Sequence, residues 1–362
     1  MKKGIWLIAA ILLLAGCWDR VEIENRAFAI AFGIDTPGSN RFRFSTVIAR
    51  PDDSPDSEGA GKDSTNDNRD SDNSSSAEGQ TLIEAMGSLD ARSSRKLSLG
   101  QAKTMVLCRG ILEDRDLFHE VIAVVGSSPE IDRAITVLAA NANVPDILTS
   151  NPGSETKPGY YMVNFYRLAP KSGGRSFQKN FESMTADLRA AGNTILPLAE
   201  LEEDSGTIQI EGALAVKDYQ LAGELDGTEL RGLLWSRNKA CKGAVLTIDN
   251  VAMVVGRHRS NLRFSEESGG IRCIINVRVK GEVFHFNEEV PETLKYEQLI
   301  AQEINETIHK LQQELELDAF NFRRALKKEK YFLYRKYADD WPQTFSEMEI
   351  IPKVRCDILI RN

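Results

Sequence analysis

The C-terminal half of this 362-residue chain is a series of apolar runs followed by one long amphipathic stretch. Residues 208–286 hold five runs whose length and turn-forming boundaries predict consecutive strands, as in an antiparallel meander. Between residues 292 and 322, Leu and Ile recur every three or four positions, which predicts one long helix with a single apolar stripe. Alternation at 347–360 predicts a final strand. The five runs are Ile208–Val216, Leu230–Trp235, Ala244–Ile248, Val251–Arg263 and Ile271–Phe286.

The N-terminal half mixes strand and helix patterns. Residues 20–34 and 41–48 predict a hairpin, and apolar spacing predicts helices at 82–89, 114–125 and 183–191, the last ended by Gly192. We therefore expect a multi-domain α+β protein with mixed and antiparallel sheets, in which the C-terminal helix packs on a sheet. Its parts are an α+β region at 17–200, a linker around 197–206 and a second α+β region at 205–362.

Residues 51–79 differ from the rest in composition. They contain nine acidic residues and two basic ones, so that this stretch carries most of the net charge of -8. Its only apolar side chains are Ala60 and Ala77, which cannot bury enough surface to offset the ordering entropy. We expect a disordered acidic insert, and a role as an acidic tether for a basic partner is the alternative.

The first residues have the layout of an export signal. Lys2 and Lys3 precede an apolar run at 4–14, and Leu14-Ala15-Gly16-Cys17 fits the bacterial lipobox. The run is shorter than the roughly 20 residues that a membrane-spanning helix needs. We predict that residues 1–16 are a signal peptide, that Cys17 is lipidated, and that the protein is anchored on the extracytoplasmic face of a membrane.

Four further cysteines follow Cys17, and none forms a C-x-x-C pair. A zinc knuckle or a thioredoxin-like redox site is therefore not indicated. An even number of thiols in an exported protein is compatible with one or two disulfides. All four lie in apolar, β-like runs, which favours buried free thiols. They are Cys108, Cys241, Cys273 and Cys356.

No motif for catalysis or for a cofactor is present. The four histidines are far apart, and neither a metalloprotease, a nucleophile-elbow nor a phosphate-loop pattern occurs. We predict no catalytic residues, no metal, no cofactor and no enzymatic activity. The negative net charge argues against nucleic acid as a partner. Basic and aromatic residues at 323–341 have two interpretations, packing at a helix end or contact with an anionic surface.

The predicted mature chain opens Cys17-Trp18-Asp19-Arg20-Val21-Glu22-Ile23-Glu24-Asn25-Arg26, and the apolar run that follows ends in Gly33-Ile34-Asp35. This opening resembles the start of the Ger(x)C family, the C subunits of spore nutrient germinant receptors. Similar segments follow in the family's order at 191–197, 211–225 and 229–235. The resemblance implies a lipoprotein of the spore inner membrane that works with two integral membrane subunits in germination. The residues that carry the opening motif are Trp18, Asp19, Glu22, Ile23, Arg26, Gly33 and Asp35.

Two interpretations of Trp18, Asp19, Glu22 and Arg26 are open. They could pack in the core with a surface ion pair, or they could lie beside the lipid and orient the domain on the bilayer. A different functional class, the solute-binding lipoprotein of a transporter, would require two α/β lobes around a cleft. The sequence identifies neither the nutrient nor any contact with a small molecule.

Overall fold

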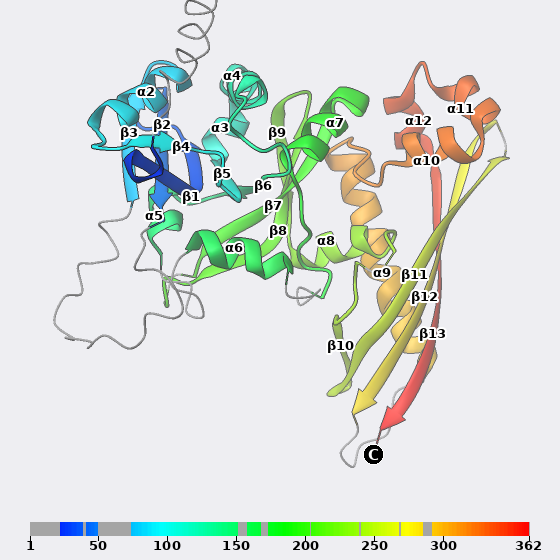
Figure 1. Cartoon of the computed structure of the whole chain (residues 1–362). Coiled ribbons are helices and arrows are strands. Elements are labelled where there is room, and N and C mark those ends of the chain that lie inside the picture. The colour runs from blue at the N-terminus through cyan, green and yellow to red at the C-terminus, as the bar shows by residue number, and fades with distance from the viewer. Residues whose placement is uncertain are drawn as a thin grey trace, which may run out of the picture.

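The computed structural model describes residues 22–38, 41–49, 74–150, 158–167, 173–202, 204–238, 240–267, 269–284 and 292–361. It has an N-terminal body built on a large mixed sheet and a C-terminal body built on a long, narrow sheet (Figure 1). Helices α8 and α9 lie where the two bodies meet (Figure 1). The α+β fold class with two sheets and packed helices is confirmed.

The N-terminal body contains nine strands. Its elements are η2 (Ile23–Asn25), β1 (Arg26–Asp35), β2 (Phe42–Ile48), β3 (Ser74–Gly79), α2 (Leu82–Arg92), β4 (Lys96–Ser98), β5 (Thr104–Cys108), α3 (Arg109–Glu113), α4 (Arg115–Ser127), β6 (Thr136–Ala140), α5 (Val144–Thr149), α6 (Pro158–Arg167), α7 (Phe181–Ala191), β7 (Asn193–Leu201), β8 (Ile208–Lys217) and β9 (Gln220–Leu225).

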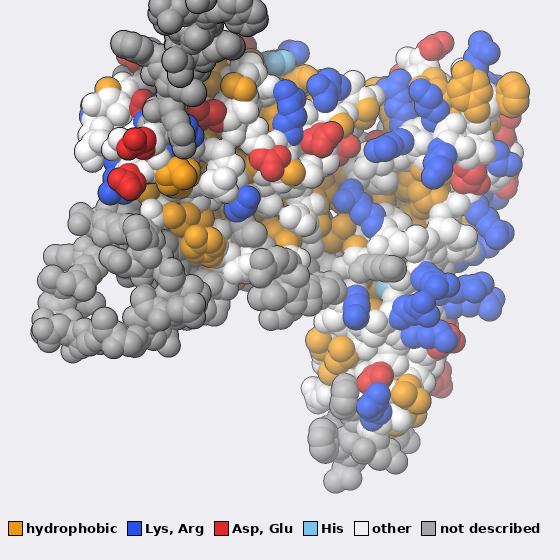
Figure 2. Space-filling view, in the orientation of Figure 1, with side chains coloured by type: hydrophobic (Ala, Val, Ile, Leu, Met, Phe, Trp, Pro, Cys, Tyr) orange, Lys and Arg blue, Asp and Glu red, His pale blue; other side chains and the backbone are white. Residues whose placement is uncertain are grey.

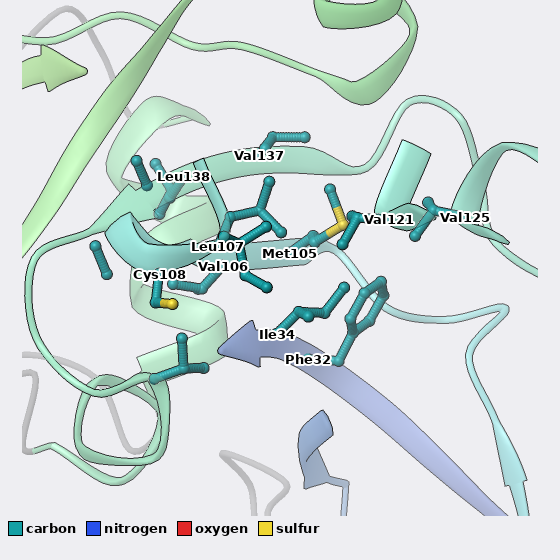
Figure 3. Packing of buried hydrophobic residues seen from close by; sticks show 14 of the residues in the cluster. Phe32, Ile34, Met105, Val106, Leu107, Cys108, Val121, Val125, Val137 and Leu138 are labelled. Carbon is teal, nitrogen blue, oxygen red and sulfur yellow. The ribbon is translucent and has the colours of Figure 1, made fainter. Parts of the chain in front are cut away.

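These strands form one sheet in the order β3-β2-β1-β5-β6-β7-β8-β9, and β4 pairs with β1. The neighbours β1, β5, β6 and β7 run parallel, and hairpins extend the sheet on both sides. Every residue of β5 and β6 is buried. Figure 3 shows Phe32, Ile34 and Met105 packed with Val121 of α4. This sheet is covered on both faces, as its continuous apolar strands require.

Local signals explain several of the elements. Thr81 accepts a hydrogen bond from the Glu84 N–H and caps α2, and Asn180 forms a capping box with Ser183 at the start of α7. Gly192 ends α7 in the left-handed region, at φ 71°. The predicted hairpin of β1 and β2 and the predicted helices at α2, α4 and α7 are all present.

The C-terminal body follows β9. Its elements are α8 (Gly227–Leu234), β10 (Val245–Ile248), β11 (Val251–Glu267), β12 (Gly270–Phe284), α9 (Thr293–His309), the π-helical turn η6 (Lys310–Glu314), α10 (Phe322–Glu329), α11 (Tyr331–Tyr337), α12 (Trp341–Glu347) and β13 (Glu349–Arg361).

The four-stranded sheet has the order β10-β11-β12-β13. The first three strands are antiparallel, and β13 runs parallel to β12. The inner face of this sheet packs on α9 and on the helices that follow it, with Ile275, Val277, Ile300 and Ile304 in one core. The predicted packing of a helix across a sheet is confirmed.

Strands β7 and β8 belong to both cores. On β8, Leu214 and Val216 lie in the core of the N-terminal body, whereas Ala213 and Ala215 lie in that of the C-terminal body. Because side chains alternate along a strand, each strand presents one face to each core. The prediction of a linker at 197–206 is wrong for residues 197–201, which belong to β7 and continue the sheet.

The prediction that residues 51–79 are disordered is wrong for residues 74–79. These form β3, which pairs with β2 and buries Ala77 beside Phe44. The pairing uses backbone groups, so a segment with few apolar side chains can still join an existing sheet. Residues 51–73 of the predicted insert lie outside the described residues.

The predicted strand at 230–235 is instead helix α8. Asp226 caps it, accepting hydrogen bonds from the Thr228 and Glu229 N–H groups, and Glu229 completes a capping box. A short apolar run fits a buried helix as well as a strand, and the capping signal decides here.

The predicted helix at 292–322 is shorter than expected. It runs to His309, continues as η6 to Glu314 and stops near Glu316, which has φ 47°. Asp318 then accepts hydrogen bonds from the Phe322 and Arg323 N–H groups and starts α10. The predicted final strand at 347–360 is β13, displaced by up to two residues because α12 ends at Glu347.

Candidate functional site

The described part of the family motif begins on the surface. Glu22 is exposed, and the Ile23 side chain is 75% exposed although isoleucine is normally buried. Arg26 starts β1, and no ion pair joins it to Glu22 among the residues that the structure describes. Core packing therefore does not account for Glu22 or Ile23. Cys17, Trp18 and Asp19 lie outside the described residues.

Gly33 allows close packing inside the N-terminal body. A Cβ atom at this position would lie 2.0 Å from Cγ1 of Val144, so that only glycine lets α5 approach β1 this closely. This motif residue therefore serves the fold.

Asp35 ends β1 and is 3% exposed. Burial raises the pKa of its carboxyl group, and the Arg43 guanidinium, at 3.6 Å, and the Val144 backbone N–H oppose this rise. Arg43 also donates hydrogen bonds of 3.1 and 3.2 Å to Glu78. The three residues link β1, β2 and β3 by an ion-pair chain, so Asp35 is a structural residue of the sheet.

The carboxyl edge of the parallel strands is where open α/β sheets bind ligands. Here Arg109, directly after β5, donates hydrogen bonds to Glu224 (2.9 Å), Asn141 (3.2 Å) and Glu113 (3.0 Å). Asn141, directly after β6, donates one of 2.6 Å to Glu200. The polar groups that could hold a ligand at this edge are thus bonded to one another.

A buried ion pair joins helices α8 and α9. Arg231 Nε donates to Glu303 Oε2 at 3.0 Å, Arg231 Nη2 bonds the other carboxylate oxygen, and Trp235 Nε1 donates to Oε2 at 2.8 Å. Burial alone would lower the pKa of Arg231, but its hydrogen bonds to Glu303 and the charge of that carboxylate raise it overall. All three side chains are buried, so this cluster has no opening to a substrate.

The two helices also meet backbone to backbone. A Cβ atom at Gly232 would lie 2.0 Å from Thr307 Oγ1 and 2.4 Å from the Glu303 carbonyl oxygen. On the other side of the cluster, His258 of β11 bonds the Trp235 carbonyl oxygen at 2.8 Å and packs edge-on against its ring. The sequence patterns do not predict this contact between α8 and α9, although residues 229–235 form one of the segments similar to the family's.

Two family models together match most of the chain. The model described as spore germination protein N-terminal domain matches residues 19–201, and the model described as spore germination B3/GerAC like, C-terminal matches residues 211–361. The chain belongs to the Ger(x)C family of spore germination proteins. The resemblance drawn from the opening motif is thereby confirmed.

Relatives within the Ger(x)C family match over nearly their whole length. Spore germination protein B3 of Bacillus subtilis (strain 168) is 21% identical over 94% of this chain and 92% of its own. The putative spore germination protein YfkR of the same organism is 20% identical over 97% and 95%. The crystal structure of the GerBC protein has the same fold, with a TM-score of 0.60 and 16% identity over 91% and 96%.

The boundary between the two Ger(x)C models falls between β7 and β8. These strands are hydrogen-bonded neighbours in one sheet, from Asn193↔Lys217 to Leu201↔Ile208. The two family domains of this chain therefore share a sheet.

Several other sequence features have a structural explanation in this Ger(x)C protein. Cys108, Cys241, Cys273 and Cys356 are buried free thiols, and burial raises the pKa of Cys356 to about 12. No group of three potential metal ligands occurs among the described residues. No described helix is both long and apolar enough to cross a membrane.

Each of the two interpretations of the basic and aromatic cluster at 323–341 applies to some of its residues. Trp341 is buried and belongs to the C-terminal core, as packing at a helix end requires. Phe332 is 88% exposed, and its neighbour Tyr331 is 51% exposed, so packing does not explain these two rings.

Proposed function

We propose that this protein is the lipid-anchored, non-catalytic subunit of a spore nutrient germinant receptor. One observation carries the proposal: two spore germination domain models cover residues 19–201 and 211–361, and the lipobox Leu14-Ala15-Gly16-Cys17 lies directly before them. The anchor would place the protein on the extracytoplasmic face of the spore inner membrane, with two integral membrane subunits as partners.

The proposed anchor acts through two fatty chains on Cys17. Each buried CH₂ group contributes about 0.8 kcal/mol, and two chains hold a protein stably where one binds reversibly. The five residue steps from Cys17 to Glu22 span at most about 18 Å. The folded body would therefore stay close to the headgroups, with the exposed Ile23 within reach of them.

Confinement to the membrane plane raises the effective concentration of the folded body near its partners. In this mechanism the residues of the chain bind and position other subunits, and no bond is made or broken. The shared strands β7 and β8 fit this role, because they present one face to each core and so hold the two bodies in a fixed relation. The buried Arg231–Glu303 pair fixes helices α8 and α9 to one another within the C-terminal body.

The test compares Cys17→Ala with Glu24→Ala, a nearby exposed position that leaves the thiol in place. We expect Cys17→Ala to leave the membrane fraction and to impair nutrient germination, and Glu24→Ala to behave as wild type. Mass spectrometry of the wild-type protein should find an N-terminal cysteine with two acyl chains. Unchanged membrane fractionation of Cys17→Ala would refute the anchor.

A further inference from the structure

The outer face of the four-stranded sheet is strongly basic and uncovered by other described elements. Figure 2 shows Lys and Arg side chains gathered over β11, β12 and β13. The exposed bases in the middle of this face are Arg259, Arg263, Arg278, Lys353 and Arg355. We call these five residues the basic face.

The register of the strands places three arginines in one row. Arg259 lies opposite Arg278, and Arg278 lies opposite Arg355. Side chains of directly opposite residues on one face are about 5 Å apart at Cβ, and like charges at this distance destabilise a sheet. This row does not stabilise the fold. We therefore look for its role in binding to another molecule.

The bases of the middle differ from those at the two ends of the same sheet. At one end Arg272 pairs with Glu267 and Glu349, and at the other Arg361 pairs with Glu282 and Lys280 with Asp357. None of the five residues of the basic face has an ion pair with any described residue. The sheet therefore neutralises its ends and leaves its middle charged.

The basic face is hollowed rather than flat. A hollow of about 800 Å³ lies over it, lined by Arg259, Arg278, Arg355 and Lys353 and by no acidic residue. Asn276 lines it as well, and its Nδ2 atom is buried without a hydrogen-bond partner among the described residues. An unpaired buried N–H group costs free energy, which an oxygen atom of a ligand would recover.

We propose that the basic face is the docking site for an acidic segment of a partner protein. Four of its five bases are arginines, whose planar guanidinium groups bind carboxylates in pairs of parallel hydrogen bonds. A flat layer of lipid headgroups does not fill a hollow, whereas a peptide segment can enter it and reach Asn276. This site is separate from the lipid anchor and does not depend on it.

Arg278→Glu is the variant that tests the site without endangering the fold. It converts the row of three arginines into an alternating Arg–Glu–Arg row, which replaces two like-charge contacts by two favourable ones. The variant should melt at the same temperature as wild type or higher. Arg95→Glu is the matched control, since Arg95 is exposed, carries the same charge and lies in the N-terminal body.

The probe is a fluorescein-labelled peptide of ten glutamates, added to the full-length protein in phosphatidylcholine vesicles and followed by anisotropy. We expect binding that weakens with salt, a loss of affinity of about tenfold or more in Arg278→Glu, and a change below about twofold in Arg95→Glu. Equal behaviour of the two variants, or no binding by wild type, would overturn the proposal.

A second measurement separates a protein partner from lipid. The wild type and Arg278→Glu are partitioned between phosphatidylcholine vesicles with and without phosphatidylglycerol. The proposal expects the same preference in both proteins. If Arg278→Glu loses a preference for the anionic vesicles while it keeps its affinity for the peptide, the basic face binds lipid headgroups and the proposal is wrong. Membrane retention through Cys17 is unaffected by either result.

Discussion

The two sheets of this protein differ in whether their charged side chains form ion pairs. The nine-stranded sheet is packed on both faces, and charged side chains on it, such as Asp35, Arg43 and Glu224, lie in ion pairs within the chain. The four-stranded sheet is packed on its inner face, and the bases in the middle of its outer face form no ion pair with any residue that the structure describes. The comparison indicates that the first sheet supports the fold and that the second has a surface available for binding.

The largest expected effect concerns the buried ion pair between helices α8 and α9 of the C-terminal body. Glu303→Gln leaves the buried Arg231 without a countercharge, and breaking a buried pair in this way costs about 3–5 kcal/mol. Urea unfolding should show this loss. Glu306→Gln, an exposed position on the same helix, should change the free energy of unfolding by less than about 0.5 kcal/mol. Similar values for both variants would mean that the pair does not hold α8 and α9 together.

A second prediction compares the two sheets directly. Leu107→Ala, in the doubly covered sheet, should cost about 2–5 kcal/mol because it leaves a cavity in a closed core. Asn261→Ala, on the outer face of the four-stranded sheet, should stay within about 0.5 kcal/mol of wild type. A large loss of stability for Asn261→Ala would show that the outer face is needed for folding.

The smallest effect is a pH dependence on the inner face of the four-stranded sheet. Burial lowers the pKa of His258, and the bond to the Trp235 carbonyl only partly opposes this. The histidine is thus neutral in the fold and takes up a proton on unfolding below about pH 6.5. The stability that depends on neutral His258 is complete above that pH and is lost as the pH falls, by at most about 1.4 kcal/mol per pH unit.

His258→Phe should flatten this slope between about pH 7 and pH 5 in melting experiments. His309→Gln is the control, because His309 lies at the end of α9 and its side chain is exposed to solvent. An unchanged slope in His258→Phe would contradict the assignment of a buried neutral imidazole.

Local patterns were sufficient for much of the fold. The spacing of apolar residues predicted α2, α4 and α7, Gly192 marked the end of α7, and alternation predicted β1, β2 and β13. These elements depend on neighbours in sequence. Strand β3 does not, because its partner β2 is reached across the acidic stretch and its side chains are mainly serine. Helix α8 was missed because an apolar run of six residues fits a strand as well as a buried helix, and the capping residues Asp226 and Glu229 lie before that run.

The candidate sites depend on contacts between distant residues, which no single segment reveals. Arg231 and Glu303 are 72 positions apart, and the arginine row depends on the exact pairing of three strands. The strand patterns at 251–263, 271–286 and 347–360 do not single out these arginines. Only the register shows that three of them are neighbours.

The sharing of β7 and β8 by the two cores bears on how such a protein can be divided. A cut at the family-domain boundary would separate β8 from β7. It would expose the edge of a sheet and one face of each core to solvent. We therefore expect that neither half folds as an independent domain. Chimaeras between relatives should keep β7, β8 and β9 from one parent, with the crossover placed elsewhere in the chain.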